Sequence, residues 1–214
     1  PFKGRLLLGL TVVLGLFSGL AASGEWGRFL QWRNATPFRM TDPQFGLDVS
    51  FYTFELPFLR FLLGFAFAAT FIALALGVVV HYLFGGLRLQ PKGDRATTAA
   101  QVQISITVAI FLFLKAIAYW LDRYDLVIQS SDLAGGFTGL QYTDVNAKLP
   151  ALNILTFVAL LVGLLFLLNA FRRQWIIPLI GLGLMVLTSV IVGGVYPLIV
   201  QQFQVRPSLS LIHI

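Results

Sequence analysis

The sequence predicts an all-α fold, a polytopic bundle of transmembrane helices. Hydrophobic residues make up 57% of the 214 residues and charged residues 11%, whereas a typical soluble domain is about half apolar and about a quarter charged. Five long stretches contain no charged residue. The shortest, of about 19 residues, would form about 29 Å of helix, and a hydrocarbon core is about 30 Å thick. These stretches are residues 6–24, 61–87, 96–114, 149–171 and 174–205.

From these stretches we expect five spans inside a transmembrane domain that covers residues 1–207. We place the spans at residues 6–23, 56–84, 99–121, 149–170 and 175–196. The bilayer itself is therefore the first expected partner of the chain.

The distribution of charge predicts how the spans are oriented. Three short segments that alternate with the spans hold seven basic residues and one acid, namely Lys3, Arg5, Arg88, Lys92, Asp94, Arg95, Arg172 and Arg173. The other segments hold eight basic and eight acidic residues, so the whole formal net charge of +6 lies on one side. Basic residues accumulate on the cytoplasmic side, so we expect the N-terminus inside and the C-terminus outside. No run of arginines and lysines interleaved with aromatic residues appears on a polar segment, which argues against a nucleic-acid partner.

The first expected span carries Gly15 and Gly19 at the spacing of closely packed membrane helices. The connection that follows, residues 25–55, is rich in aromatic residues, and Trp26, Phe29 and Arg33 recur in it at helical spacing. We expect a short helix there that lies in the membrane interface, where tryptophan is favoured.

The second and third expected spans contain few polar residues. Pro57 opens the second span at a helix N-terminus, where its missing N–H costs least. His81 lies near the inner end of that span, and we expect an interfacial polar residue rather than a ligand. In the third span, Lys115 either extends past Tyr119 towards water or pairs with Asp122, which is seven residues further along the same face.

The fourth and fifth expected spans are joined by a tight, basic turn. The fourth begins beside Pro150, and we expect Asp144 or Asn146 to cap its N-terminus. The fifth ends before Pro197, and glycines such as Gly193 predict that it packs closely against a neighbour.

Several chemistries are missing from the sequence. There is no cysteine, which excludes disulfides, thiolate metal sites and a cysteine nucleophile within these residues. Motifs of hydrolases, nucleotide sites and calcium loops are also missing, so we expect no cofactor and no metal, and an enzymatic activity stays undecided. The middles of the expected spans contain no acid, histidine, lysine or arginine, whereas an ion-coupled transporter usually places such a residue there.

A candidate site lies at the outer ends of the third and fourth spans, where we expect a polar cap. Charges near the membrane boundary gain by pairing, because the dielectric constant there is lower than in water. We expect Asp122 or Asp125 to contact Lys115, Arg123 or a group within residues 142–146. The alternative is that these charges contact only water. The candidate cap residues are Lys115, Asp122, Arg123, Asp125, Asp144 and Asn146.

Five strings occur in order between the expected spans. They are DPQFGLDVSFYTFELPF (42–58), HYLFGGLRLQ (81–90), AYWLDRYDL (118–126), YTDVNAKLP (142–150) and VQQFQVRPS (200–208). With these strings the chain resembles the uncharacterised bacterial membrane-protein family 0182 (UPF 0182) over about residues 4–207. The resemblance implies seven N-terminal spans followed by a large extracytoplasmic domain. This chain would then be a fragment that holds the last five spans. Residues 208–214 (SLSLIHI) depart from the family pattern.

The resemblance supplies no established activity and no catalytic residue. We expect a multi-pass protein of the bacterial plasma membrane that anchors and scaffolds an extracytoplasmic domain in the cell envelope. Its other expected partners are the N-terminal spans and the extracytoplasmic domain of the same protein. Two alternatives stay open: a transporter or channel subunit, and a membrane enzyme whose catalytic groups lie in the missing domain.

Overall fold

The computed structural model describes residues 2–88, 96–129, 139–172 and 174–205. Over these ranges the chain is mainly helical. Backbone pairing of the β type is limited there to two isolated bridges, Thr41 with Asp48 and Leu87 with Ala96. Two compact units are present, Pro1–Leu62 and Leu63–Ile214, and each is described by itself. The basic-loop residues at 92, 94 and 95 and the tail 208–214 lie outside the described residues.

Four helices in the described part are long and apolar enough to cross a membrane. They are Phe51–Leu83, Thr98–Ile128, Asp144–Arg172 and Ile176–Phe203. These helices confirm the all-α membrane-type fold and match the last four expected spans. The first expected span lies in α1 (Phe2–Ser23), where the apolar stretch described, Thr11–Ser23, is shorter. A fifth crossing and the sidedness of the termini stay predictions.

Three of these helices contain a wide, π-helical turn of five residues. Three turns lie within or before the long helices: Phe51–Glu55 before α3 (Leu56–Leu83), Asp144–Lys148 before α5 (Leu149–Arg172), and Ile191–Val195 between α6 (Ile176–Val190) and α7 (Tyr196–Val200). A further π-helical turn, Gln201–Val205, follows α7.

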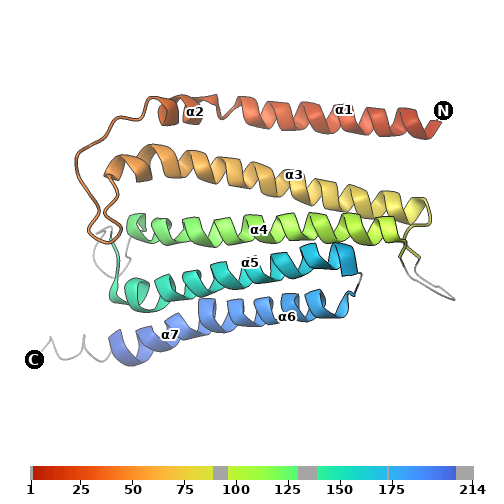
Figure 1. Ribbon diagram of the computed structural model, residues 1–214. Helices are drawn as coiled ribbons and strands as arrows, with labels where there is room; N and C mark the ends of the chain where they lie inside the picture. Colours follow the sequence, from red (N-terminus) through yellow and green to blue (C-terminus); the bar gives the residue numbers. More distant parts are fainter. Residues whose placement is uncertain (1, 89–95, 130–138, 173, 206–214) are drawn as a thin grey trace, which may run out of the picture. The chain divides into compact units, whose positions relative to one another are not determined.

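Each of the first three wide turns ends two residues before a proline: Pro57, Pro150 or Pro197. A proline cannot donate to the carbonyl four residues earlier, and its ring clashes with that carbonyl. Widening the turn relieves the clash and lets the helix continue. The last helix therefore passes through Pro197 instead of ending at Tyr196 as expected (Figure 1).

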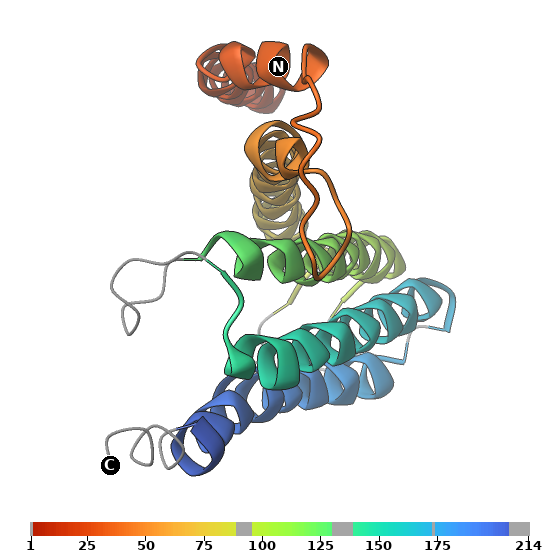
Figure 2. The ribbon, with the colours of Figure 1, turned by 90° about the vertical axis from the view of Figure 1, so that its left-hand side faces the viewer.

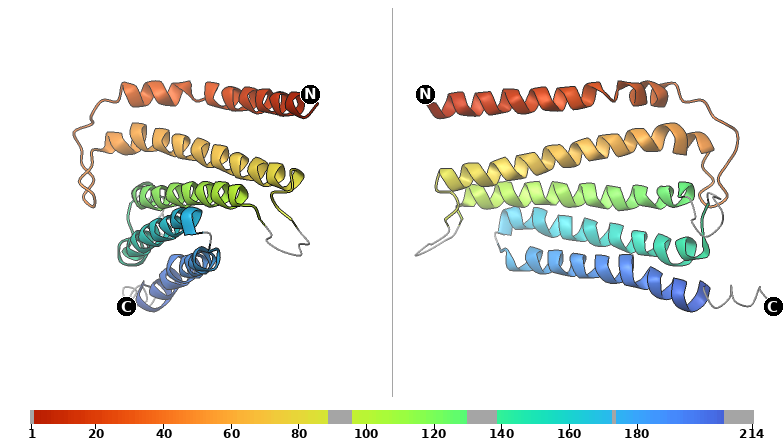
Figure 3. Two further views of the ribbon diagram at one scale, coloured as in Figure 1. Left: turned by 45° about the vertical axis from the view of Figure 1, so that its right-hand side comes forward. Right: turned by 180° about the vertical axis from the view of Figure 1, so that it is seen from behind.

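Helix α5 lies between α4 (Thr98–Ile128) and the α6–α7 helix (Figures 2 and 3). The seam between α4 and α5 is the main packing contact of the second unit. Its buried residues recur at alternating spacings of three and four, as in helices that cross at a shallow angle. They are Ala109, Leu112, Ala116 and Tyr119 on α4, and Leu155, Ala159, Val162 and Phe166 on α5. Small and large side chains from the two helices thus fill one apolar core, which Met185 of α6 completes.

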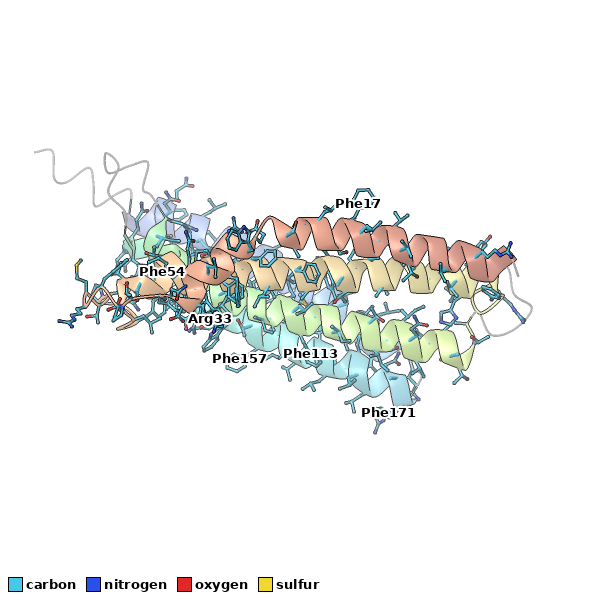
Figure 4. The ribbon with its side chains drawn as sticks, turned by 90° about the horizontal axis from the view of Figure 1, so that it is seen from above. Phe17, Arg33, Phe54, Phe113, Phe157 and Phe171 are labelled. Carbon is cyan, nitrogen blue, oxygen red and sulfur yellow. The ribbon has the colours of Figure 1, made fainter. Side chains whose placement is uncertain are left out.

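The opposite face of α5 is apolar and exposed. Phe157, Leu161, Leu164, Leu168 and Phe171 follow one another along it. Phe157 and Phe171 point away from the neighbouring helices (Figure 4). An apolar stripe of this length suits contact with lipid, because the tails of a bilayer are as apolar as leucine.

Glycines in the second unit lie against neighbouring side chains. A Cβ atom built on Gly163 would lie 2.9 Å from Cε1 of Phe113, so the Phe113 ring packs directly on this backbone. A Cβ on Gly193 would lie 3.3 Å from Cδ1 of Leu155, as expected for a glycine that allows close packing. By contrast, a Cβ on Gly15 or Gly19 would meet no described atom within 4 Å. The packing expected at these two glycines of α1 is therefore not present within the described chain.

Hydrogen bonds join the end of α3 to the beginning of α4. Nε2 of His81 lies 2.8 Å from Oε1 of Gln103, which links the end of α3 to the first turns of α4. His81 is thus an interhelical hydrogen-bonding residue. Thr97 caps α4: its side-chain oxygen accepts the N–H of Ala100 at 3.4 Å, and its own N–H donates to the Gly86 carbonyl at 2.8 Å.

In the first unit, the expected short helix is α2 (Trp26–Arg33). Its Phe29 and Trp32 pack on Phe58 from the start of α3, with ring centroids 5.9 Å and 4.7 Å from that of Phe58. Trp26 is two-thirds exposed. The helix therefore presents both a packed aromatic face and an exposed aromatic face, which agrees with an interfacial position.

Residues 40–49 form a hairpin, hereafter the 40–49 hairpin, that is held together by two carboxylates. Asp42, which is buried, accepts the N–H of Phe45 at 2.6 Å and the hydroxyl of Tyr52 at 3.2 Å. Asp48 accepts the backbone N–H groups of Phe38, Arg39 and Ser50 at 2.8–3.0 Å.

These bonds stabilise the charged form of Asp48. Together they lower the pKa of Asp48 from 3.8 to about 2. The backbone N–H of Ser50 lowers this pKa most, the Ser50 hydroxyl comes next, and the N–H groups of Phe38 and Arg39 contribute less.

Candidate functional site at one end of the helix bundle

Helix α4 continues to Ile128, beyond the expected end of the third span at Leu121. Leu121 and Leu126 are both buried, so one apolar face of the helix extends through this segment. Asp122, Arg123 and Asp125 consequently lie on the last two turns of a helix. The expected third span ended before them, at Leu121.

Asp144 organises the beginning of the next membrane helix. Its side-chain oxygen accepts the N–H of Gln141 at 2.9 Å, and its other oxygen pairs with Nζ of Lys148 at 2.8 Å. The first bond resembles half of a capping box, with Gln141 at the cap position and Asp144 three residues later. Asp144 therefore acts from inside the first turn, and not as the cap residue that the sequence analysis expected.

Asn146 is not a cap residue either. Its side-chain amide donates to the carbonyl of Tyr142 at 2.9 Å, so it bonds one turn back along its own helix.

Arg123 connects α4 to α5. Its Nη1 donates to Oδ1 of Asn153 at 2.8 Å, and its guanidinium carbon lies 3.7 Å from the centroid of the Trp120 ring. The planar guanidinium can thus stack on an aromatic ring and donate a hydrogen bond to another helix at once.

Lys115 extends along α4 towards the same end. Its ammonium lies 4.4 Å from the centroid of the Tyr119 ring. This is the direction expected for a lysine that carries its charge out of the hydrocarbon core.

Two adjoining cavities open between the last turns of α4, the first turn of α5 and the Ile191–Val195 turn. The first, of about 220 Å³, is lined by Asp122, Asp125 and Gln129, with Leu126, Ala151 and Leu152 as apolar wall. The second, of about 350 Å³, is lined by polar Gln141, Thr143 and Gln201, with Gly194, Pro197 and Leu198. Lys148 and Gly193 line both cavities. We refer to the two together as the Lys148 groove.

The structure thus gathers only part of the expected set around one space. Asp122 and Asp125 line the groove, and Asp144 pairs with the lysine at its centre. Lys115, Arg123 and Asn146 have the separate contacts described above.

Sequence reasoning did not identify Lys148 or Asn153 as members of this site. The ion pair of Lys148 could have been predicted, since Lys148 stands four residues after Asp144, the spacing of neighbouring side chains on a helix. Asn153 could have been noticed as an amide inside an otherwise apolar stretch.

A second polar contact missed by sequence reasoning lies near the other end of the seam. Nδ2 of Asn169 donates to the hydroxyl of Ser105 at 2.9 Å, and both residues are buried. Asn169 also lines a small cavity of about 50 Å³ with Arg172 and Gln174. Its Oδ1 has no hydrogen-bond partner within the described residues.

The Lys148 groove offers carboxylates, one ammonium and neutral amides over apolar walls. No group of three or more His, Cys, Asp or Glu residues that could hold a metal ion occurs in the described ranges. The polar and charged groups of the groove have the chemistry to contact a polar, partly charged ligand.

Comparison with known proteins identifies the family. The sequence model of a family described as "Uncharacterised protein family (UPF0182)" matches residues 2–210. The chain belongs to the UPF0182 family. The matched region includes residues 208–210, which lie beyond the boundary at Pro207 that the sequence resemblance implied.

Bacterial UPF0182 proteins match almost the whole chain. The relative from Streptomyces coelicolor is 51% identical over 210 residues, which cover 97% of this chain and 21% of the relative. Relatives from Frankia alni and Thermobifida fusca are each 48% identical, over 97% of this chain and 20% of their own length. The chain thus spans about a fifth of these relatives. No solved structure matches it.

Proposed function

We propose that this chain is the membrane part of a UPF0182 protein of the bacterial plasma membrane. In this proposal the helices anchor a larger part of the same protein and hold it in position on the extracytoplasmic side. The observation that carries the proposal is the arrangement of charged groups. The α4–α5 seam is hydrophobic apart from a few uncharged polar side chains such as Ser105 and Asn169, while charged and amide side chains gather at the end of the bundle in the Lys148 groove.

The apolar seam supports an anchor over a coupled transporter. A transported proton or ion needs an acidic or basic partner near the middle of the membrane. The hydrophobic core shared by α4, α5 and α6 contains the hydroxyl of Tyr119, and the buried polar side chains described on α4 and α5 are Ser105, Thr156 and Asn169. None of these polar side chains is a carboxylic acid, lysine, arginine or histidine.

The lengths of the relatives support a larger attached part. About four-fifths of each listed UPF0182 relative lies outside the matched region. The last described helical segment, Gln201–Val205, begins at Gln201, which lines the Lys148 groove. We propose that the polar cap of Lys115, Asp122, Arg123, Asp125, Asp144 and Asn146 helps to orient the attached part.

The experiment uses the full-length Streptomyces coelicolor relative with a protease site inserted at the position aligned with Val205. Protease added to intact, right-side-out spheroplasts is expected to cut the protein there. A matched variant carries the same site at the position aligned with Arg88, and it should be cut only after permeabilisation. Protection of the first site in intact spheroplasts would contradict the proposed topology.

The same experiment separates an anchor from a scaffold. If the bundle positions the attached part by contact, the cleaved part stays on the washed membrane. Complete release into the supernatant after cleavage would leave the bundle as a simple anchor and remove the scaffolding role.

A further inference from the structure

The Lys148 groove combines charges of both signs with apolar walls. At one side, Asp122 and Asp125 of α4 line the first cavity. At the other side, Gln141 and Gln201 line the second cavity, and Lys148 stands between them. An elongated ligand that carries a positive and a negative group would therefore meet complementary charges along its length.

Two wide turns form part of this groove. Lys148 is the last residue of the Asp144–Lys148 turn, and Gly193 and Gly194 belong to the Ile191–Val195 turn. A Cβ on Gly194 would meet no described atom within 4 Å, so a ligand can approach the backbone there, whereas Gly193 packs against Leu155. Wide turns of this kind occur frequently at functional sites in helices.

The mixture of charges limits the class of ligand. A purely anionic ligand would be repelled by the two carboxylates. A purely cationic ligand would leave unused the further N–H donors of Lys148, one of which Asp144 already engages at 2.8 Å. The groove lies at the end of helices whose outer faces are apolar, where lipid headgroups meet the hydrocarbon core. Leu198, which lines the second cavity, is two-thirds exposed and can contact an acyl chain.

We propose that the Lys148 groove binds the headgroup of a zwitterionic phospholipid that carries a primary ammonium, a phosphoethanolamine lipid. The ammonium would donate hydrogen bonds towards Asp122 and Asp125, and the phosphate would accept them from Lys148. Hydrogen bonds between charged partners are shorter and stronger than neutral ones.

A choline headgroup fits the groove less well. Its quaternary nitrogen has no N–H to donate, and proteins recognise such groups with cages of aromatic side chains. No aromatic residue is among the described residues that line either cavity. The groove should therefore distinguish ethanolamine from choline lipids, although both carry the same net charge.

This inference requires that the helices lie in a membrane, but it does not depend on an attached extracytoplasmic part. The experiment is native mass spectrometry of the full chain, purified in detergent with an equimolar mixture of palmitoyl-oleoyl phosphatidylethanolamine, phosphatidylcholine and phosphatidylglycerol. An additional ion pair at such a boundary predicts roughly threefold more phosphatidylethanolamine adducts than adducts of either other lipid. Equal retention of the three lipids, as expected if another part of the protein fills the groove, would overturn the proposal.

Variants locate the binding. The double variant Asp122→Asn with Asp125→Asn should lose the preference for phosphatidylethanolamine, and Glu25→Gln, an acid of the first unit paired with Arg28 at 2.9 Å, should keep it. A preference that survives in the double variant would place the lipid elsewhere and overturn the proposal.

A second measurement uses only the wild-type protein, so it does not depend on how the variants fold. Soluble glycerophosphoethanolamine should displace bound phosphatidylethanolamine, whereas glycerophosphocholine at the same concentration should not. Equal displacement by both compounds would contradict recognition of the ammonium.

Discussion

The α4–α5 seam and the 40–49 hairpin differ in how much polar side chains contribute to their structure. The seam contains few polar side chains, and two of them, Ser105 and Asn169, bond to each other. The hairpin contains two carboxylates, Asp42 and Asp48, that accept hydrogen bonds from the backbone around them. The seam is thus held by the fit of its surfaces, and the hairpin is held by charge.

This difference predicts two kinds of sensitivity. A change of side-chain volume should disturb the seam, because close-packed interiors have no room for an added group. A change of protonation should disturb the hairpin, because the hydrogen bonds there are made to ionised acceptors.

The largest expected effect is at Gly163 in the seam. Gly163→Leu would drive a side chain into the Phe113 ring and should lower the free energy of unfolding by about 3 kcal/mol, the upper part of the range for overpacking. The measurement is thermal unfolding in detergent. Gly183→Leu is the matched control, since a Cβ on Gly183 of α6 meets no described atom within 4 Å. Equal losses in both variants would mean that volume in the seam is not the deciding factor.

The hydrogen bond inside the seam should contribute less. Ser105→Ala and Asn169→Ala, measured singly and together, form a double-mutant cycle that isolates the interaction between the two side chains. We expect a coupling energy of about 0.6 kcal/mol, the average for such bonds between membrane helices. A value above about 2 kcal/mol would show that the seam depends on polar contacts as the hairpin does.

Acid should loosen the hairpin without loosening the seam. The pKa of Asp48 is lowered to about 2 in the folded chain, so its carboxylate stabilises the hairpin above pH 3.8, and this contribution is lost as the pH falls towards about 2. Hydrogen exchange at the Phe38, Arg39 and Ser50 amides should become less protected over that interval, relative to the intrinsic rate at each pH.

In Asp48→Asn the protection of the same three amides should be low at every pH. Protection in the wild type that is constant between pH 4 and pH 2 would contradict the role of charge.

The smallest expected effect is at Gly15. Gly15→Leu should change the unfolding temperature of the chain by less than about 2 °C, because surface substitutions away from packed features stay within about 0.5 kcal/mol. A loss as large as that of Gly163→Leu would reveal a packing partner for α1 that the described chain does not contain.

The sequence predicted the fold class and four of the long helices because each depends on a run of apolar residues, which is visible without tertiary information. It misplaced helix ends at Leu121 and Tyr196 for two separate physical reasons. After Leu121, buried leucines on one face outweigh the charges that interrupt the apolar run. At Tyr196, the wide turn before Pro197 removes the clash that would otherwise end the helix.

The candidate site was predictable only in part. Asp122 and Asp125 were recognisable as acids at the end of an apolar run. Their position beside Lys148 and Gly193 depends on how three helices approach one another, and no local pattern specifies that approach. The pair of Ser105 and Asn169 shows the same limit, since its members are 64 residues apart in sequence.

The wide turns also affect how the bundle responds to force. Kinks in helices concentrate at prolines and π-helical turns, and such points act as hinges. In the second unit, the turns Asp144–Lys148 and Ile191–Val195 both lie at the groove end, while the opposite end is held by the His81–Gln103 and Ser105–Asn169 bonds. At the groove end Arg123 of α4 and Asn153 of α5 are also bonded, at 2.8 Å, so we expect bending at the Ile191–Val195 turn, in the helix that this bond does not hold. A load applied beyond Val205 would then change the width of the Lys148 groove before it separated the helices.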